Sequence, residues 1–169
     1  MILSALIVLT AQFFSVQGNF VVLLKDIDCP LFNEEFFTEP DAYIDDNNAI
    51  FFNTTIVKEL LPTTQGYLAI IGASLGEYVV NTGFDIQMPL CDMMNEPVIL
   101  GPLLRVFGFS EDNCPPKMGV YGSEGYTLPT ATFPDDFPRN QYQSLFELTI
   151  EEEDSNSYFE VRRTQKLTY

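Results

Sequence analysis

The chain has 169 residues and a strongly acidic balance, with 24 Asp and Glu against 8 Lys and Arg and a formal net charge of −16. A surface of that sign repels phosphate groups, which excludes nucleic acid and anionic membranes as partners. The hydrophobic share of 46%, with fifteen Phe and eight Tyr, excludes a disordered chain and indicates one domain with an apolar core.

Residues 1–18, MILSALIVLTAQFFSVQG, have the features of a secretory signal peptide. The first half of the segment is apolar, none of its side chains is charged, and Val16 and Gly18 occupy the −3 and −1 positions of a cleavage site. The apolar run is shorter than the roughly 20 residues of a membrane-spanning helix, so we expect no stable membrane insertion. The sequence predicts a secreted, extracellular protein whose mature chain, residues 19–169, is a single domain.

Most of the mature chain consists of short segments in which apolar and polar residues alternate with a period of two. This pattern is typical of antiparallel strands with one face on a core and the other in water. Turn-forming runs such as Asp45–Asn48 separate the segments. The sequence therefore predicts an all-β fold, an antiparallel β-sandwich or cup of about seven or eight strands. The predicted strands are 20–25, 50–58, 66–73, 78–88, 117–127, 146–151 and 158–166.

Residues 96–109, EPVILGPLLRVFGF, depart from the alternating pattern. Their apolar side chains are spaced as in a helix, and Pro102 interrupts the run. We expect one short helix or helical loop here, between Cys91 and Cys114.

The chain has three cysteines, which cannot all pair with one another in an oxidising compartment. Cys91 and Cys114 are the predicted disulfide because they bracket the helical excursion. Closing a loop of this size stabilises a fold by roughly 3 kcal/mol in the chain-entropy model. Cys29 is left over, and it could stay buried as a small apolar residue, pair with another chain, or displace one member of the predicted pair.

The pentapeptide Gly72-Ala73-Ser74-Leu75-Gly76 matches the G-x-S-x-G motif of serine nucleophiles. That motif needs a strand before it and a helix after it, whereas here a period-two strand follows, so we expect a hairpin turn. Activation of a serine also needs a base, and the chain has no histidine and no lysine near the motif. We therefore expect no enzyme activity at Ser74.

The other carboxylate-rich runs also lack catalytic or metal-binding order. Asp45-Asp46, Asp135-Asp136 and residues 151–154 fall in turns or at strand ends, where charged side chains are solvated. Residues 41–48 lack the D-x-[DN]-x-[DN]-G order of a calcium loop, and a zinc site lacks histidine. The sequence predicts no catalytic residue, no metal ligand and no cofactor.

One modification site is present, the sequon Asn53-Thr54-Thr55. On a strand, the side chain of Asn53 points away from the face that carries Phe52 and Ile56. On the secretory route, the sequence predicts a glycan on an exposed Asn53.

Four segments together resemble insect secreted proteins related to the ganglioside activator and to the MD-2-related lipid-recognition (ML-like) domains. They are IFFNTTIVKEL, FDIQMPLCDMM, FGFSEDNCPPKMGVYGSEGYTLP and LPTATFPDDFPRNQYQSLFELTIEE. The resemblance covers residues 20–169 and is most specific from Cys91 through Pro115-Pro116 to Tyr126. It implies a cup of two antiparallel sheets that holds lipid tails or another apolar ligand without catalysis. The shortage of Lys and Arg departs from relatives that capture anionic headgroups.

The predicted function is that of a secreted, non-catalytic carrier or presenter of a lipid or small hydrophobic ligand held between two sheets. Its affinity would come from apolar burial, at about 25 cal/mol per Å² before the costs of binding. Leu103, Leu104 and Phe107 are the predicted mouth or lid. The predicted cavity residues are Phe52, Ile56, Tyr78, Val80, Phe84, Ile86, Phe146, Leu148, Phe159 and Val161.

The alternative is a secreted protein–protein interaction module, a co-receptor or immune factor, whose sandwich core is filled by the same residues. Its acidic faces would meet a cationic protein partner, and Cys29 would cross-link the complex. An empty interior beside residues 98–109 favours the carrier, whereas a packed interior favours the interaction module.

Overall fold

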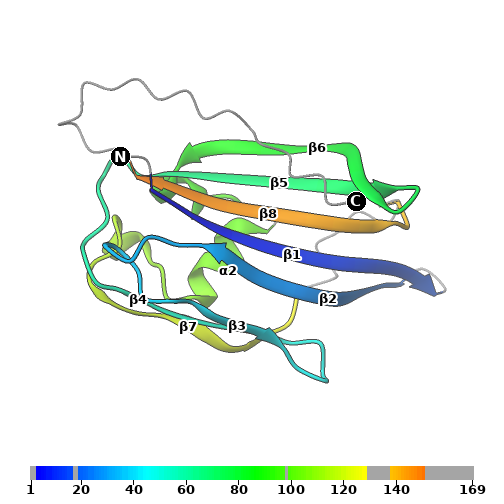
Figure 1. Cartoon of the computed structure of the whole chain (residues 1–169), viewed down its shortest axis with the longest axis horizontal. Helices are drawn as coiled ribbons and strands as arrows, with labels where there is room; N and C mark the ends of the chain where they lie inside the picture. The colour runs from blue at the N-terminus through cyan, green and yellow to red at the C-terminus, as the bar shows by residue number, and fades with distance from the viewer. Residues whose placement is uncertain (1–2, 17–18, 98, 129–137, 151–169) are drawn as a thin grey trace.

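The computed structural model of the chain describes residues 3–16, 19–97, 99–128 and 138–150. These residues form eight antiparallel strands in two sheets that lie one above the other (Figure 1). The predicted all-β antiparallel sandwich is therefore confirmed. The predicted strand 158–166, with Phe159 and Val161, and the acidic runs 135–136 and 151–154 lie outside the described residues.

The larger sheet has five strands in the order β2-β1-β8-β5-β6. Every neighbouring pair in it is antiparallel. The strands are β1 (Leu3–Val16), β2 (Asn19–Leu31), β5 (Gln65–Ser74), β6 (Glu77–Pro89) and β8 (Gln141–Ile150).

The segment predicted to be a signal peptide forms β1, which lies inside the larger sheet. It pairs with β2 from Leu6↔Leu31 to Val16↔Asn19, and with β8 from Leu3↔Ile150 to Gln12↔Gln141. Removal of residues 1–18 is a processing event that the fold of the whole chain does not test. The signal peptide, and with it the domain boundary at residue 19, stays a prediction.

The smaller sheet has three strands, β3 (Asp41–Ile44), β4 (Ile50–Ile56) and β7 (Gly119–Tyr126), with β4 in the middle. Alternate residues of β4 are buried, from Ile50 to Ile56, as its period of two requires. β3 was not predicted because four residues are too short for that period to show. The predicted turn Asp45–Asn48 is present, and the Asn48 side chain joins the two sheets. Its Oδ1 accepts from the Leu24 backbone N–H at 2.7 Å, and its Nδ2 donates to the Val22 carbonyl oxygen at 2.8 Å.

β5 and β6 form a hairpin at the position of the G-x-S-x-G match. Ser74 pairs with Glu77, so Leu75 and Gly76 form a two-residue turn, with φ values of 53° and 89°. Positive φ at both central residues is the signature of the tight turn that joins antiparallel strands. A strand follows the motif, as predicted, and the helix that a nucleophile elbow needs is not there.

The space between the sheets is filled by apolar side chains and by the helical excursion. The excursion has three short helical elements: α1 (Leu90–Met93), α2 (Leu100–Val106) and the 3-10 turn η1 (Glu111–Asn113). Figure 1 shows α2 between the two sheets. Leu104 of α2 belongs to one buried cluster with Phe52 of β4 and Leu148 of β8. The predicted short helix between the cysteines is confirmed, and it packs inside the sandwich.

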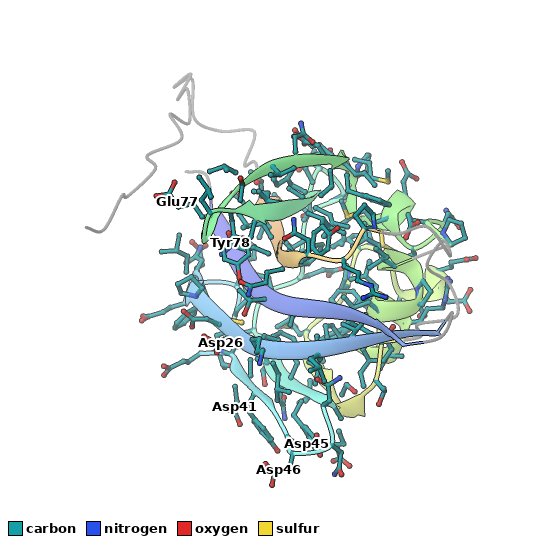
Figure 2. All side chains as sticks on the ribbon, turned by 90° about the vertical axis from the view of Figure 1, so that its right-hand side faces the viewer. Asp26, Asp41, Asp45, Asp46, Glu77 and Tyr78 are labelled. Atoms are coloured by element: carbon teal, nitrogen blue, oxygen red, sulfur yellow. A yellow bond between two sulfur atoms is a disulfide. The ribbon has the colours of Figure 1, made fainter. Side chains whose placement is uncertain are left out.

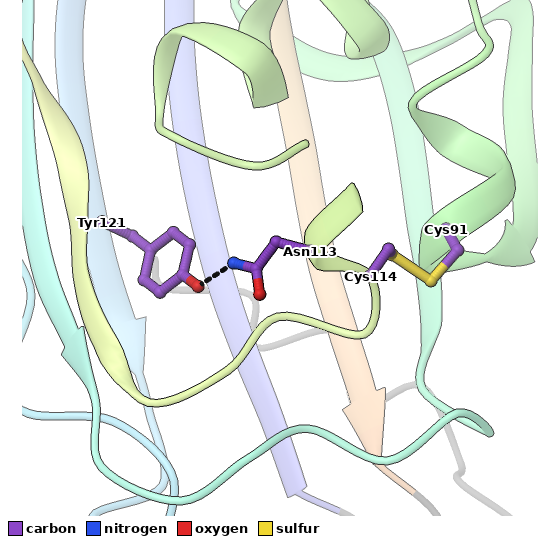
Figure 3. The surroundings of a disulfide bond; sticks show 4 residues. All are labelled: Cys91, Asn113, Cys114 and Tyr121. Atoms are coloured by element: carbon purple, nitrogen blue, oxygen red, sulfur yellow. Dashed lines mark hydrogen bonds between the residues drawn. A yellow bond between two sulfur atoms is a disulfide. The ribbon is translucent and has the colours of Figure 1, made fainter. Parts of the chain in front are cut away.

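The Cys91–Cys114 disulfide is present, as predicted, with a Cα–Cα distance of 5.7 Å. It joins α1 to the segment that leads from η1 into β7 (Figure 3). Next to it, the Asn113 amide donates to the Tyr121 hydroxyl oxygen at 2.7 Å, and that hydroxyl donates to the Lys117 carbonyl at 3.0 Å. These bonds and the disulfide hold the start of β7 against the helical excursion.

Candidate apolar ligand site

An apolar pocket of about 40 Å³ lies between the two sheets beside α2. It collects side chains from both sheets because β4 and β8 each present alternate apolar residues to the interior. α2 and the residues after it close one side. The lining residues are Cys29, Leu31, Phe37, Pro40, Phe52, Thr54, Ile56, Leu104, Phe107, Phe109, Phe146 and Leu148.

The polar atoms of the lining are neutral. The Thr54 hydroxyl donates to the Thr38 carbonyl oxygen at 3.0 Å, so its hydrogen-bonding capacity is used within the protein. Burial, with a smaller effect from the negative charge of Asp28, raises the pKa of Cys29 to about 11. The thiol is therefore protonated at neutral pH and behaves as a small apolar group. A pocket of this chemistry suits an apolar ligand and rejects an ion.

Aromatic rings form much of the wall on the α2 side. The Phe52 and Phe107 rings stack with their centroids 4.9 Å apart and an interplanar angle of 28°. Phe107 is only 6% exposed, and Leu104 is buried in the same cluster. Two of the three residues of the predicted lid, Leu104 and Phe107, therefore face the pocket. Leu103, the third, is half-buried and does not line the pocket. It packs against this cluster and against a second core cluster, which includes Ile50 and Tyr142.

The pocket opens to solvent at the end of β2. Leu31, the last residue of that strand, lines the pocket and is 57% exposed. Pro40, from the segment before β3, is half-buried beside it.

The structure brings together only part of the predicted cavity set. Phe52, Ile56, Phe146 and Leu148 line the pocket, from β4 and β8. The four predicted residues on β6 lie elsewhere in the larger sheet: Val80 is exposed, Phe84 packs against the second core cluster, and Tyr78 and Ile86 are half-buried. Phe159 and Val161 are outside the described residues.

Six lining residues were not in the predicted set: Cys29, Leu31, Phe37, Pro40, Thr54 and Phe109. Phe37 and Pro40 come from the irregular segment between β2 and β3, where no period of two or 3.6 marks an inward position. The pair Phe36-Phe37 was the available signal, because two adjacent aromatic residues outside a strand rarely both face water. Phe36 and Phe37 are both buried.

The other motifs that were considered as sites lie in turns or on the outer face of a sheet, in the part of the chain that is described. Ser74 is exposed in the hairpin turn. Asp45 accepts hydrogen bonds from the backbone N–H groups of Ala49 and Asn47 and from the Asn47 amide, which lowers its pKa. Figure 2 shows Asp41, Asp45 and Asp46 pointing outward from the smaller sheet. The described residues contain no group of three or more potential metal ligands, and none of their helices is long and apolar enough to cross a membrane.

Comparison with protein-family models, with curated proteins and with solved structures finds no match for this chain. The ML-like resemblance therefore stays a prediction from the residues.

Proposed function

We propose that the protein is a secreted, non-catalytic carrier or presenter of a lipid or small hydrophobic ligand, whose apolar end enters the pocket between β4, β8 and α2. One observation carries the proposal. A pocket lined by apolar and neutral groups opens to solvent at Leu31. The resemblance to ML-like domains, which hold apolar ligands between two sheets, supports the same function.

The size of the pocket limits the ligand that it accepts without rearrangement. A cavity of about 150 Å³ is needed to admit benzene, and sites for drug-sized ligands span about 300–1,000 Å³. The volume here is about 40 Å³. The pocket therefore takes the tip of an apolar chain, and a longer tail enters only as side chains at the mouth move apart. Leu31, which is more than half exposed at the mouth, is the side chain with room to move.

The small volume also favours the second candidate function, a protein–protein interaction module with a filled core. Tyr43 and Val120 are 50% and 71% exposed on the outer face of the smaller sheet, where a partner could cover them. With a net charge of −16, the protein would attract a cationic protein partner.

A charge at the mouth of the pocket tests the carrier. Leu31→Asp places a carboxylate where the ligand enters, and desolvation of that carboxylate opposes binding. Leu31 is more than half exposed, so the fold should tolerate the change. We expect the affinity for a fluorescent fatty-acid probe to fall at least tenfold, about 1.4 kcal/mol. The measurement is a fluorescence titration of wild type and variant.

Leu75→Asp is the matched control, because Leu75 is fully exposed in the β5–β6 turn and does not line the pocket. It makes the same change in charge and should leave the affinity unchanged. Equal binding by Leu31→Asp and wild type would contradict the proposed entrance. If wild type binds no member of a panel of lipids and volatile hydrophobic compounds, the carrier is wrong and the interaction module is favoured.

A further inference from the structure

The outer face of the smaller sheet carries an open hollow of about 310 Å³ around the sequon residue Asn53. Across the three strands, Asn53 pairs with Asp41 of β3 and with Gly122 of β7, and the next row is Tyr43, Phe51 and Glu124. The two rows share one face because residues i and i+2 of a strand point the same way.

An aromatic pair forms one wall of the hollow. The rings of Tyr43 and Phe51 stack with centroids 4.8 Å apart and an interplanar angle of 2°. The Phe51 ring also covers Gly125 on the neighbouring strand, where a Cβ atom would lie 3.3 Å from it. Glycine at this position thus lets the ring lie flat on the sheet. Half of Tyr43 is still exposed, which leaves the pair open to a further apolar contact.

Gly122 is the residue beside Asn53 on the neighbouring strand. Gly122 pairs with Asn53 and has no side chain, and a Cβ atom built there would lie 2.1 Å from the Phe52 carbonyl oxygen. Any larger residue at position 122 would force β4 or β7 to move. β7 therefore places no side chain beside Asn53 at this position.

The rim of the hollow is polar and contains no basic side chain among its lining residues. Asp41 and Glu124 pair across the strands with Asn53 and Phe51, and they supply carboxylate oxygens on this outer face. Carboxylates accept hydrogen bonds from neutral hydroxyl and amide groups and repel anions. An aromatic wall with an acceptor-rich rim suits a sugar, which has an apolar C–H face and a rim of hydroxyl donors.

We propose that the first N-acetylglucosamine of a glycan on Asn53 docks in this hollow, with its C–H face against the Tyr43–Phe51 pair. The attachment point is inside the hollow, so the sugar is held there at a high effective concentration and weak contacts suffice. The hollow, at about 310 Å³, has room for one sugar residue. The proposal rests on the secretory route predicted from residues 1–18 and is independent of the carrier function.

The experiment compares glycosylated and unglycosylated protein secreted from eukaryotic cells. Thr55→Ser keeps the sequon, whereas the near-isosteric Thr55→Val removes it without changing Asn53. We expect the glycosylated forms to melt about 2–4 °C above Thr55→Val. An endoglycosidase that leaves a single N-acetylglucosamine should preserve this difference, because the first sugar makes the contact.

A double-mutant cycle assigns the effect to the aromatic pair. In a Phe51→Leu background, the difference in Tm between sequon-containing and Thr55→Val protein should vanish. Phe84→Leu is the matched control, because Phe84 packs in the other sheet, and there the difference should persist. Proton NMR of the trimmed glycoprotein gives an independent readout, in which ring currents should move the N-acetyl methyl resonance upfield.

Three outcomes would overturn the proposal. The first is secreted protein with unmodified Asn53. The second is an N-acetyl methyl resonance at its ordinary position. The third is a glycan-dependent rise in Tm that Phe51→Leu leaves intact.

Discussion

Removal of residues 1–18, as the signal-peptide prediction requires, would take β1 out of the middle of the larger sheet. β1 forms ten residue pairs with β2 and ten with β8. An antiparallel ladder has about one hydrogen bond per pair. Their loss would leave the facing edges of β2 and β8 without partners, and each backbone group left buried and unpaired costs roughly 1–3 kcal/mol. Since a domain is stable by only about 5–15 kcal/mol, a few such groups are enough to unfold residues 19–169 unless another strand takes that place.

The sequence offers one candidate, residues 158–166, which lie outside the described residues and carry a period-two pattern. A strand that returns after β8 through a short connection runs antiparallel to β8. β1 has that same direction, because it is antiparallel to both β8 and β2. We therefore expect the mature chain to fold with residues 158–166 in the place of β1.

The assay compares residues 19–169 and 19–157, each secreted from eukaryotic cells behind an unrelated signal peptide. We expect the longer form to unfold cooperatively in urea and the shorter form to aggregate or to unfold at a much lower midpoint. Two point variants of 19–169 sharpen the comparison. Val161→Asp places a charge on the predicted apolar face and should lower the free energy of unfolding by several kcal/mol. Thr164→Asp is on the opposite face and should change the free energy of unfolding by less than about 0.5 kcal/mol.

Equal urea midpoints for 19–169 and 19–157 would refute this reasoning, and so would equal losses from Val161→Asp and Thr164→Asp. N-terminal sequencing of the natural secreted protein tests the premise that residues 1–18 are removed, and Asn19 is the expected first residue. A first residue at Met1 or Ile2 would show that β1 is retained and that the signal-peptide prediction is wrong.

The remaining predictions concern the cysteines. Replacing both Cys91 and Cys114 by serine opens a loop with a sequence separation of 23. We expect the free energy of unfolding to fall by about 3 kcal/mol and the Tm to fall by about 6–12 °C by calorimetry. An unchanged Tm would contradict this expectation. Because burial raises the pKa of Cys29 from 9.0 to about 11, iodoacetamide should alkylate it slowly in native protein at pH 8 and rapidly in urea. The raised pKa also makes stability depend on pH: its contribution is fully present below pH 9 and is lost as the pH rises through 11. Equal alkylation rates in native protein and in urea would show that the Cys29 thiol is not buried.

Local patterns determine much of this fold. The period of two in β6 and β8 predicts half-buried strands because successive side chains point to opposite faces, and the structure has those strands. The hairpin at Leu75-Gly76 and the helix between the cysteines follow equally from short stretches of sequence. The Cys91–Cys114 pair was predictable because both residues flank that one excursion.

Which inward-facing residues share the pocket was decided by tertiary structure alone. A period of two says that Phe84 and Phe146 each face inward, but it does not say which strands lie opposite each other. The order β2-β1-β8-β5-β6 places β8 over β4 and α2, and leaves Phe84 of the edge strand β6 with the second core cluster. Phe37 and Pro40 enter the pocket from an irregular segment with no pattern of its own. Contacts between segments distant in the chain depend on how the two sheets pack, and that information is not contained in any one segment.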